Sequence, residues 1–217
     1  MSVALLGLPQ TEPGCLVPTW GVLPVGALRS GKSRLASVLS PAERETFILE
    51  TLERTLGLLG TAPSLEAVVV VSPDEAVRAL AARRGAAVLR DVREDLNAAL
   101  EEATLWAQAE DAERLLILAA DLPLLGSGDL EALLGLESGP SVCIAPCKDE
   151  SGTNALAVRP PGLLRYRFGP QSFAAHCRAA HAAGAHLRVV RSRSLSFDID
   201  TPRDYSLLRQ WREKAVR

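Results

Sequence analysis

Aromatic residues are scarce in this sequence, and long apolar runs are missing from it. Only 4% of the 217 residues are aromatic, whereas 47% are hydrophobic, an ordinary share for a globular protein. Every apolar run falls far short of the roughly 20 residues that a membrane-spanning helix needs, and no basic segment ahead of an apolar core marks a secretory signal. The formal net charge of −2 provides no global basic field for nucleic acid. We therefore expect a globular protein that engages neither membranes nor nucleic acids.

Cysteine and histidine are also few, and neither is arranged like a metal site. The cysteines form no CxxC pair: Cys15, Cys143, Cys147 and Cys177. Residues 142–145 have the pattern of a strand, so Cys143 should face the core. We expect reduced thiols and a cytoplasmic protein. The histidines have no metal-ligand spacing and are expected to be surface or packing residues: His176, His181 and His186.

Apolar, β-rich stretches alternate with helical stretches along the chain. The expected strands are residues 21–25, 67–72, 86–89, 115–120, 142–146, 154–159 and 187–191. The expected helices are residues 41–59, 74–84, 96–110, 129–135, 172–183 and 202–214, and Ser40, Pro41 and Glu43 mark the first of these with a capping box. Residues 68–71 and 115–118 are apolar on both faces, which is typical of central parallel strands covered by helices. We expect one α/β domain over residues 16–217, with a mostly parallel central sheet and helices on both faces, after a loose leader at residues 1–15.

Residues 26–33 match the phosphate-binding pattern G-x-x-x-x-G-K-[ST], and Asp121 ends an apolar run as the magnesium-binding aspartate of P-loop proteins does. These features favour a P-loop GTPase or kinase. However, a helix opened by Lys32 and Ser33 would have only two turns, because Ser40 begins another one. The P-loop interpretation also leaves several polar segments unexplained, namely residues 152–154, 168–172 and 198–200.

Several segments, taken in order, resemble the CofC/FbiD family of guanylyltransferases over roughly residues 19–206. They are residues 32–35 (KSRL), 39–41 (LSP), 96–100 (LNAAL), 120–124 (ADLPL), 152–156 (GTNAL), 167–173 (RFGPQSF) and 198–202 (DIDTP). The resemblance implies a Rossmann-like nucleotidyltransferase domain of the GT-A-like type. It implies transfer of GMP from GTP to phosphoenolpyruvate or 2-phospho-L-lactate, with release of pyrophosphate, as a step in coenzyme F-420 biosynthesis. It also implies a homodimer, because members of the family are commonly dimers.

One position departs from the family pattern. Members often carry a lysine where this chain has Gly26, so a cation that would face the phosphates is missing, and Arg29 is a candidate to replace it. The same glycine completes the P-loop pattern, and we therefore interpret that match as accidental.

Three aspartates are candidates for holding Mg²⁺, namely Asp121, Asp198 and Asp200. In an extended stretch, Asp198 and Asp200 project from the same side, and their carboxylates would repel each other unless a cation lies between them. Mg²⁺ prefers such oxygen ligands. The alternative is structural: Asp200 would cap the helix that follows, Asp198 would be a solvated edge residue, and Asp121 would only form a turn.

Lys32 and Arg34 resemble the triphosphate-binding pair of the family, and with Asp121 they are the expected catalytic residues. A helix beginning near Gly31 would add N–H donors and a favourable dipole for phosphate. The alternative is a solvated basic helix end.

The guanine or ribose is expected to contact Asn97 and the backbone of Ser72 and Pro73. Asn97 could instead simply cap the helix that follows it.

On the acceptor side, three residues match family positions that contact the phosphorylated acid: Thr153, Gly169 and Ser172. The N–H groups at the start of the helix after Gly169 could bind a phosphate or carboxylate. Ser172 could also act as a plain helix cap.

Two further alternatives stay open. One is a related nucleotidyltransferase with another nucleotide or acceptor, and the other is a nucleotide-binding module without catalysis.

Overall fold

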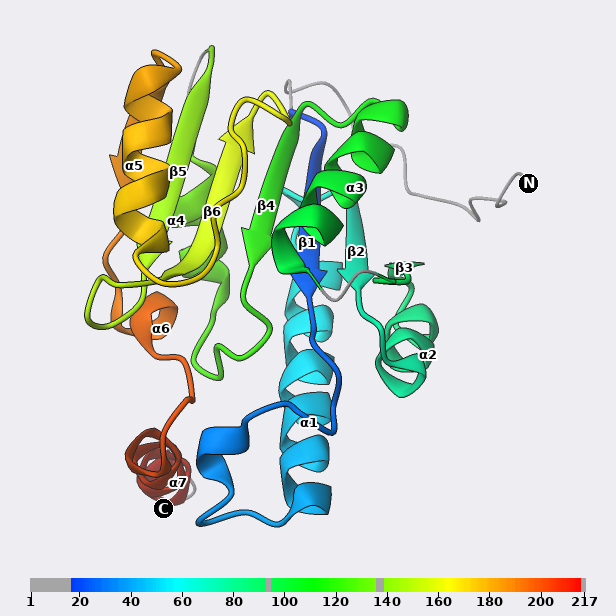
Figure 1. The fold of residues 1–217 in the computed structure, drawn as a ribbon, viewed down its shortest axis with the longest axis vertical. Coiled ribbons are helices and arrows are strands. Elements are labelled where there is room, and N and C mark those ends of the chain that lie inside the picture. Colours follow the sequence, from blue (N-terminus) through cyan, green and yellow to red (C-terminus); the bar gives the residue numbers. More distant parts are fainter. Residues whose placement is uncertain (1–16, 93–94, 136–138, 216–217) are drawn as a thin grey trace.

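A seven-stranded sheet forms the centre of the computed structural model, which describes residues 17–92, 95–135 and 139–215 (Figure 1). The strands are β1 (Thr19–Pro24), β2 (Ala67–Val71), β3 (Ala87–Leu89), β4 (Arg114–Leu118), β5 (Ser141–Pro146), β6 (Thr153–Arg159) and β7 (His186–Val189). All seven expected strands are confirmed, each to within two residues at its ends. The expected leader, residues 1–15, lies outside the described residues.

The sheet is mostly parallel, as predicted, with the order β3-β2-β1-β4-β6-β5-β7. Strands β1, β2, β3 and β4 pair in parallel, as do β5 and β7. Among the described strands, β6 alone runs against its neighbours, β4 and β5. The carboxyl ends of β1, β2 and β4 thus lie along one edge, where ligands bind in sheets of this kind.

Helices cover both faces of the sheet (Figure 1). One face packs against α1 (Pro41–Gly60), α2 (Glu75–Arg83), α4 (Ser127–Leu134) and the short α6 (Arg193–Ser196). The other face packs against α3 (Leu96–Ala109) and α5 (Ser172–Ala182). Strand β4 is buried on both faces, because Leu116 and Leu118 belong to one core cluster while Leu115 and Ile117 belong to the other. Its sequence is therefore apolar throughout and does not alternate with polar residues. Apart from α6, each of these helices was expected.

A third, smaller cluster attaches the last helix, α7 (Pro202–Ala215), to the beginning of the chain. It joins Phe197, Ile199 and Leu208 to Leu35 and Phe47. Leu35 ends a three-residue 3-10 helix, η1 (Ser33–Leu35), which contacts α7 directly. This packing places the residues around position 199 beside the segment that follows β1, although more than 150 residues separate the two in sequence.

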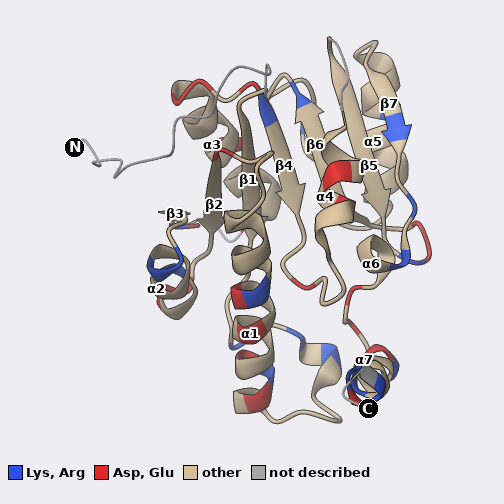
Figure 2. Cartoon of the chain, turned by 180° about the vertical axis from the view of Figure 1, so that it is seen from behind, with Lys and Arg blue, Asp and Glu red and all other residues tan. Residues whose placement is uncertain are grey.

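The distribution of charged residues and the lengths of the apolar helices are as the composition predicts. Figure 2 shows acidic and basic residues interspersed along α1 and α7. None of the described helices is both long and apolar enough to cross a bilayer. Cys143 is buried in β5, as predicted.

Candidate active site

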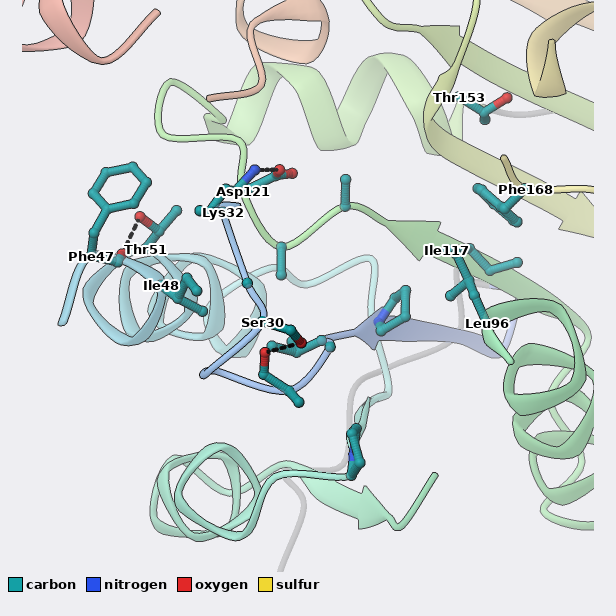
Figure 3. Close-up of a pocket in the computed structure, with 18 residues that line it drawn as sticks. Ser30, Lys32, Phe47, Ile48, Thr51, Leu96, Ile117, Asp121, Thr153 and Phe168 are labelled. Atoms are coloured by element: carbon teal, nitrogen blue, oxygen red, sulfur yellow. Dashed lines mark hydrogen bonds and ion pairs between the residues drawn. The ribbon is translucent and has the colours of Figure 1, made fainter. Parts of the chain in front are cut away.

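A cavity of about 520 Å³ opens at the carboxyl ends of β1 and β4. Lys32 and Asp121 lie on one side of it, and Thr153 and Phe168 lie on the other (Figure 3). Pro73, which follows β2, also lines the cavity. The cavity therefore reaches residues that the sequence assigned to metal, nucleotide and acceptor.

The segment between β1 and α1 does not form a P-loop. Lys32 is left-handed, with a φ of 52°, and only the three-residue η1 follows it. The expected helix N-terminus near Gly31 is therefore wrong, and so is the P-loop alternative, because a P-loop binds phosphate at the start of a longer helix. Asp74 Oδ2 instead anchors the segment by accepting a hydrogen bond from Leu28 N at 3.2 Å. Arg44 donates to the Gly31 carbonyl at 3.4 Å.

Lys32 connects the middle of the chain to its C-terminal part. Its ammonium forms ion pairs with Asp121 and with Asp200 Oδ1, the latter at 2.8 Å. Arg34 lies farther out, with its guanidinium 3.8 Å from Asp200 Oδ2 and its side chain 75% exposed. Asp200 therefore does not act as the cap that the structural alternative assigned to it. Its carboxylate faces the cavity-lining lysine.

The charge balance at Lys32 favours its protonated form. Burial lowers the pKa of the Lys32 ammonium, but the carboxylates of Asp121 and Asp200 outweigh burial and raise the pKa above its usual 10.5. The side chain is only 12% exposed. Lys32 is thus a fixed, desolvated positive charge at the cavity wall, the kind of group that stabilises phosphate oxygens during transfer.

Asp198 is partly buried. Burial, reinforced by the nearby charge of Asp121, raises the pKa of the Asp198 carboxyl above its usual 3.8. Asn154 opposes this effect, because its Nδ2 donates to Asp198 Oδ1 at 3.2 Å. The same Nδ2 donates to the Leu195 carbonyl at 3.0 Å. Asn154 therefore fixes both the turn before Asp198 and its carboxylate.

The donor set suits Mg²⁺ only in part. Within the described ranges, no group of three His, Cys, Asp or Glu residues is arranged to enclose a metal ion, and Lys32 occupies the space between Asp121 and Asp200. Asp121 and Asp198 are near enough for one charge to disfavour the other, and no basic side chain of the described residues pairs with Asp198. Mg²⁺ is commonly held by one or two carboxylates together with substrate phosphates. The residues fit a site of that open kind.

Asn97 does not cap α3, so the capping alternative is wrong, while its expected contact with the nucleotide stays a prediction. Asp95 caps α3, since its Oδ1 accepts hydrogen bonds from the backbone of Asn97 and Ala98. The Asn97 amide pairs with the backbone of Phe168: Oδ1 accepts from Phe168 N at 2.7 Å, and Nδ2 donates to Phe168 O at 3.1 Å. Asn97 therefore holds the segment that forms the far wall of the cavity.

Ser72 and Pro73 lie directly after β2. Ser72 is fully buried, and its hydroxyl accepts a hydrogen bond from Asp74 N at 3.1 Å. Pro73 reaches the cavity. The turn that these residues form thus lies at the edge of the cavity, and its contact with a nucleotide stays a prediction.

The three expected acceptor residues lie around the start of α5. Thr153, the first residue of β6, lines the cavity, and its Oγ1 is 3.1 Å from His176 Nδ1. Ser172 begins α5 and is buried, and His176 follows it by four residues, on the same face of the helix. Gly169 has a φ of 128°, which favours glycine, and an added β-carbon there would meet nothing within 4 Å. Gln171, not Ser172, occupies the capping position.

Comparison with known proteins gives the family. The model of the family described as "Guanylyl transferase CofC like" matches residues 19–209. The chain belongs to the CofC family.

Three curated members of the CofC family differ in the acid that their names contain. Phosphoenolpyruvate guanylyltransferase of Rubrobacter xylanophilus is 46% identical over 87% of this chain and 92% of its own length. 3-phospho-D-glycerate guanylyltransferase of Phenylobacterium zucineum is 39% identical over 82% and 85%. 2-phospho-L-lactate guanylyltransferase of Methanothermobacter thermautotrophicus is 37% identical over 86% and 82%. A solved nucleotidyl transferase from the last organism shares the fold, with a TM-score of 0.69, 20% identity, and coverage of 91% and 99%.

Two residues next to the site were not proposed as site residues from the sequence, namely Asn154 and His176. Asn154 lies inside a segment that carried the resemblance, but its partners Leu195 and Asp198 are about 40 residues away and gave no local signal. His176 was expected only to pack. It is fully buried, as a packing residue would be, yet it also bonds Thr153 and the backbone of Arg167.

Proposed function

We propose that this protein is a guanylyltransferase that moves GMP from GTP to a small phosphorylated acid and releases pyrophosphate. One observation carries the proposal: a desolvated lysine, paired with Asp121 and Asp200, stands at one side of a cavity whose other side carries Thr153, one of the three expected acceptor residues. Membership in the CofC family supports the same reaction.

The reaction joins two anions without a covalent enzyme intermediate. A phosphate oxygen of the acceptor forms a new P–O bond to the α-phosphorus of GTP. The bond between that phosphorus and the oxygen leading to the β-phosphate breaks, and pyrophosphate leaves with the bonding electrons. The acceptor phosphate is already ionised near neutral pH, so the residues need only orient the reactants and neutralise their charge.

Lys32 and Arg34 neutralise the triphosphate in this proposal. Lys32 is buried and held by two carboxylates, so its ammonium is pre-positioned and does not have to be desolvated when GTP binds. The exposed Arg34 is free to move toward the leaving pyrophosphate while remaining near Asp200.

Mg²⁺ would be held by Asp121 and Asp198, with Asp200 at its edge, and by phosphate oxygens of GTP. When bound, the ion would withdraw charge from the triphosphate. A cation near Asp198 would also favour the ionised form of this carboxyl, which burial now disfavours.

GTP would place its base and ribose along the turn of Ser72 and Pro73. The acceptor would bind at Thr153, Gly169 and Ser172. Its identity is proposed as phosphoenolpyruvate, by analogy with the relative at 46% identity, and 2-phospho-L-lactate and 3-phospho-D-glycerate are the competing acids named in other relatives.

The product would serve coenzyme F-420 biosynthesis. We further propose a cytoplasmic homodimer, as the family resemblance suggests.

The test is product analysis by mass spectrometry with GTP, Mg²⁺ and each of the three acids. We expect a GMP–acid phosphoanhydride and pyrophosphate with at least one acid. Asp121→Asn should lower this rate by about 100-fold or more, whereas Asp111→Asn, the same change at an exposed position before β4, should leave it unchanged. GDP with orthophosphate would instead indicate a GTPase, GDP with a further phosphorylated acid would indicate a kinase, and either result would refute the proposal.

A further inference from the structure

His176 connects two parts of the acceptor side that come from different strands and loops. It lies on α5, is fully buried, and bonds through both ring nitrogens. Nδ1 is 3.1 Å from Thr153 Oγ1, and Nε2 accepts a hydrogen bond from Arg167 N at 3.0 Å. The ring also meets Phe168 edge to face, with centroids 4.8 Å apart. These two hydrogen bonds satisfy both ring nitrogens of the buried histidine, and they tie α5 to Thr153 and to the backbone of Arg167.

The partner of Nε2 determines which nitrogen carries the proton. The Arg167 backbone N–H can only donate, so Nε2 must be the unprotonated nitrogen. In a neutral ring, Nδ1 then bears the hydrogen and donates it to Thr153 Oγ1. Burial, together with the nearby Arg167 charge, lowers the pKa of His176 to about 4, so the ring is neutral near pH 7.

The tautomer has a consequence for Thr153. Its Oγ1 already accepts a hydrogen bond from His176, so the hydroxyl hydrogen is free to point elsewhere. Thr153 lines the cavity, and an anion in the cavity can accept that hydrogen. The threonine is thus oriented as a donor, which is what a phosphate or carboxylate requires.

The same histidine also holds the backbone at Arg167, which precedes Phe168, and Phe168 lines the same cavity as Thr153. Arg167 N bonds to His176, and the following residue, Phe168, is held by both groups of the Asn97 amide. Gly169, an expected acceptor contact, comes directly after these two clamped residues. His176 therefore controls one side chain and one backbone segment of the same site.

We propose that His176 is a positioning residue of the acceptor site, which holds the Thr153 hydroxyl as a donor toward the phosphorylated acid and fixes the Arg167–Phe168 backbone beside it. The inference rests on the proposed function, because it assigns the cavity beside Thr153 to the acceptor. It predicts that changes at His176 affect binding of the acid and leave binding of GTP unchanged.

Two substitutions separate the two hydrogen bonds. The amide of His176→Asn lies where Nδ1 was and can still donate to Thr153, whereas the amide of His176→Gln lies near Nε2 and cannot. We expect His176→Gln to raise the KM for the acid by about tenfold, the effect of losing one hydrogen bond, and to leave the KM for GTP within about twofold. His176→Asn should recover most of the loss. His181→Gln, an exposed change on the same helix, is the control.

A double-mutant cycle tests whether His176 acts through Thr153. Thr153→Val should raise the acceptor KM about as much as His176→Gln, and the double variant should be no worse than Thr153→Val by more than about twofold. Additive effects, or equal changes in both KM values, would overturn the inference. If a variant fails to fold, ¹⁵N NMR of the wild-type imidazole decides instead: a protonated Nδ1 is expected, and a protonated Nε2 contradicts the proposal.

The outcomes for the function and for the inference are distinct. A wild-type protein that transfers GMP to none of the three acids would refute the proposed function. A wild-type protein that transfers GMP while His176→Gln leaves the acceptor KM unchanged would refute only the role of His176.

Discussion

His176 is buried without charge, and this makes the folded protein sensitive to acid in a defined pH window. The pKa of its ring falls from the usual 6.5 to about 4, first because of burial and second because of the charge of Arg167. In the unfolded chain the ring would protonate near pH 6.5. Between these two values the unfolded state binds a proton that the folded state does not, so acid favours unfolding.

The magnitude follows from the two pKa values. Each tenfold change in proton affinity is worth about 1.4 kcal/mol, so the neutral ring contributes about 3 kcal/mol to the free energy of unfolding. This contribution is fully present above about pH 6.5. It is lost progressively as the pH falls toward about 4, below which the ring is charged in both states.

Urea unfolding at several pH values between 7 and 4 measures this effect. His176→Gln has no ionisable ring, and the carboxylates titrate in both proteins, so the difference between the wild-type and variant free energies isolates the histidine. We expect the wild-type advantage to shrink by about 3 kcal/mol over this range. His181→Gln, at an exposed position of the same helix, is the control. A constant difference for His176→Gln would show that the buried ring does not titrate as the structure indicates.

Three other changes test the cavity. Lys32→Met removes the ammonium that neutralises the triphosphate. It should lower kcat/KM by about 10- to 100-fold, as expected for one charged hydrogen bond. Steady-state kinetics measure this change, and an unchanged kcat/KM would contradict the role of Lys32. Asn154→Leu removes the hydrogen bond that orients the Asp198 carboxylate. The Mg²⁺ concentration that gives the half-maximal rate should rise by about tenfold. A metal titration identical to that of the wild type would contradict the role assigned to Asn154. Gly26→Lys adds a cation at a position where an added β-carbon would meet nothing within 4 Å. The KM for GTP should fall by roughly threefold or more, and an unchanged or higher KM would mean that the lysine does not reach the phosphates.

The strands were predictable because burial on both faces leaves a clear pattern. The unbroken apolar run of β4 indicated a central strand, and both core clusters use it. The direction of β6 was less evident, since apolar strands look alike whichever way they run. One signal was present, however. Six residues, 147–152, separate β5 from β6, and a parallel crossover needs about a dozen or more.

Local patterns misled where the backbone conformation depends on distant contacts. Residues 26–33 match a phosphate-binding loop, yet Lys32 is left-handed and only a 3-10 helix follows. The residues that hold this segment come from elsewhere in the fold: Asp74 caps α2, and Arg44 lies in α1. The partner of Asn97, Phe168, is 71 residues away. Such a pairing leaves no trace in residue spacing.

The site was partly predictable because polar residues follow the strands. Asp121 and Lys32 come after β4 and β1, whose carboxyl ends lie together in a parallel sheet. The contact of Lys32 with Asp200 depends on α7 packing against η1, which no sequence pattern indicates. A metal ion was expected between Asp198 and Asp200, whereas in the structure the Lys32 ammonium lies between Asp121 and Asp200.

The bond that breaks is the most direct test of the account. An acceptor acid with ¹⁸O in its phosphate is incubated with GTP, Mg²⁺ and the wild-type protein, and the products are followed by ³¹P NMR, in which ¹⁸O shifts the resonance of the phosphorus it is bonded to. The account predicts ¹⁸O in the phosphoanhydride that links the acid to GMP and unlabelled pyrophosphate. Label in released orthophosphate or pyrophosphate, or the appearance of GDP, would contradict attack by the acceptor phosphate on the α-phosphorus.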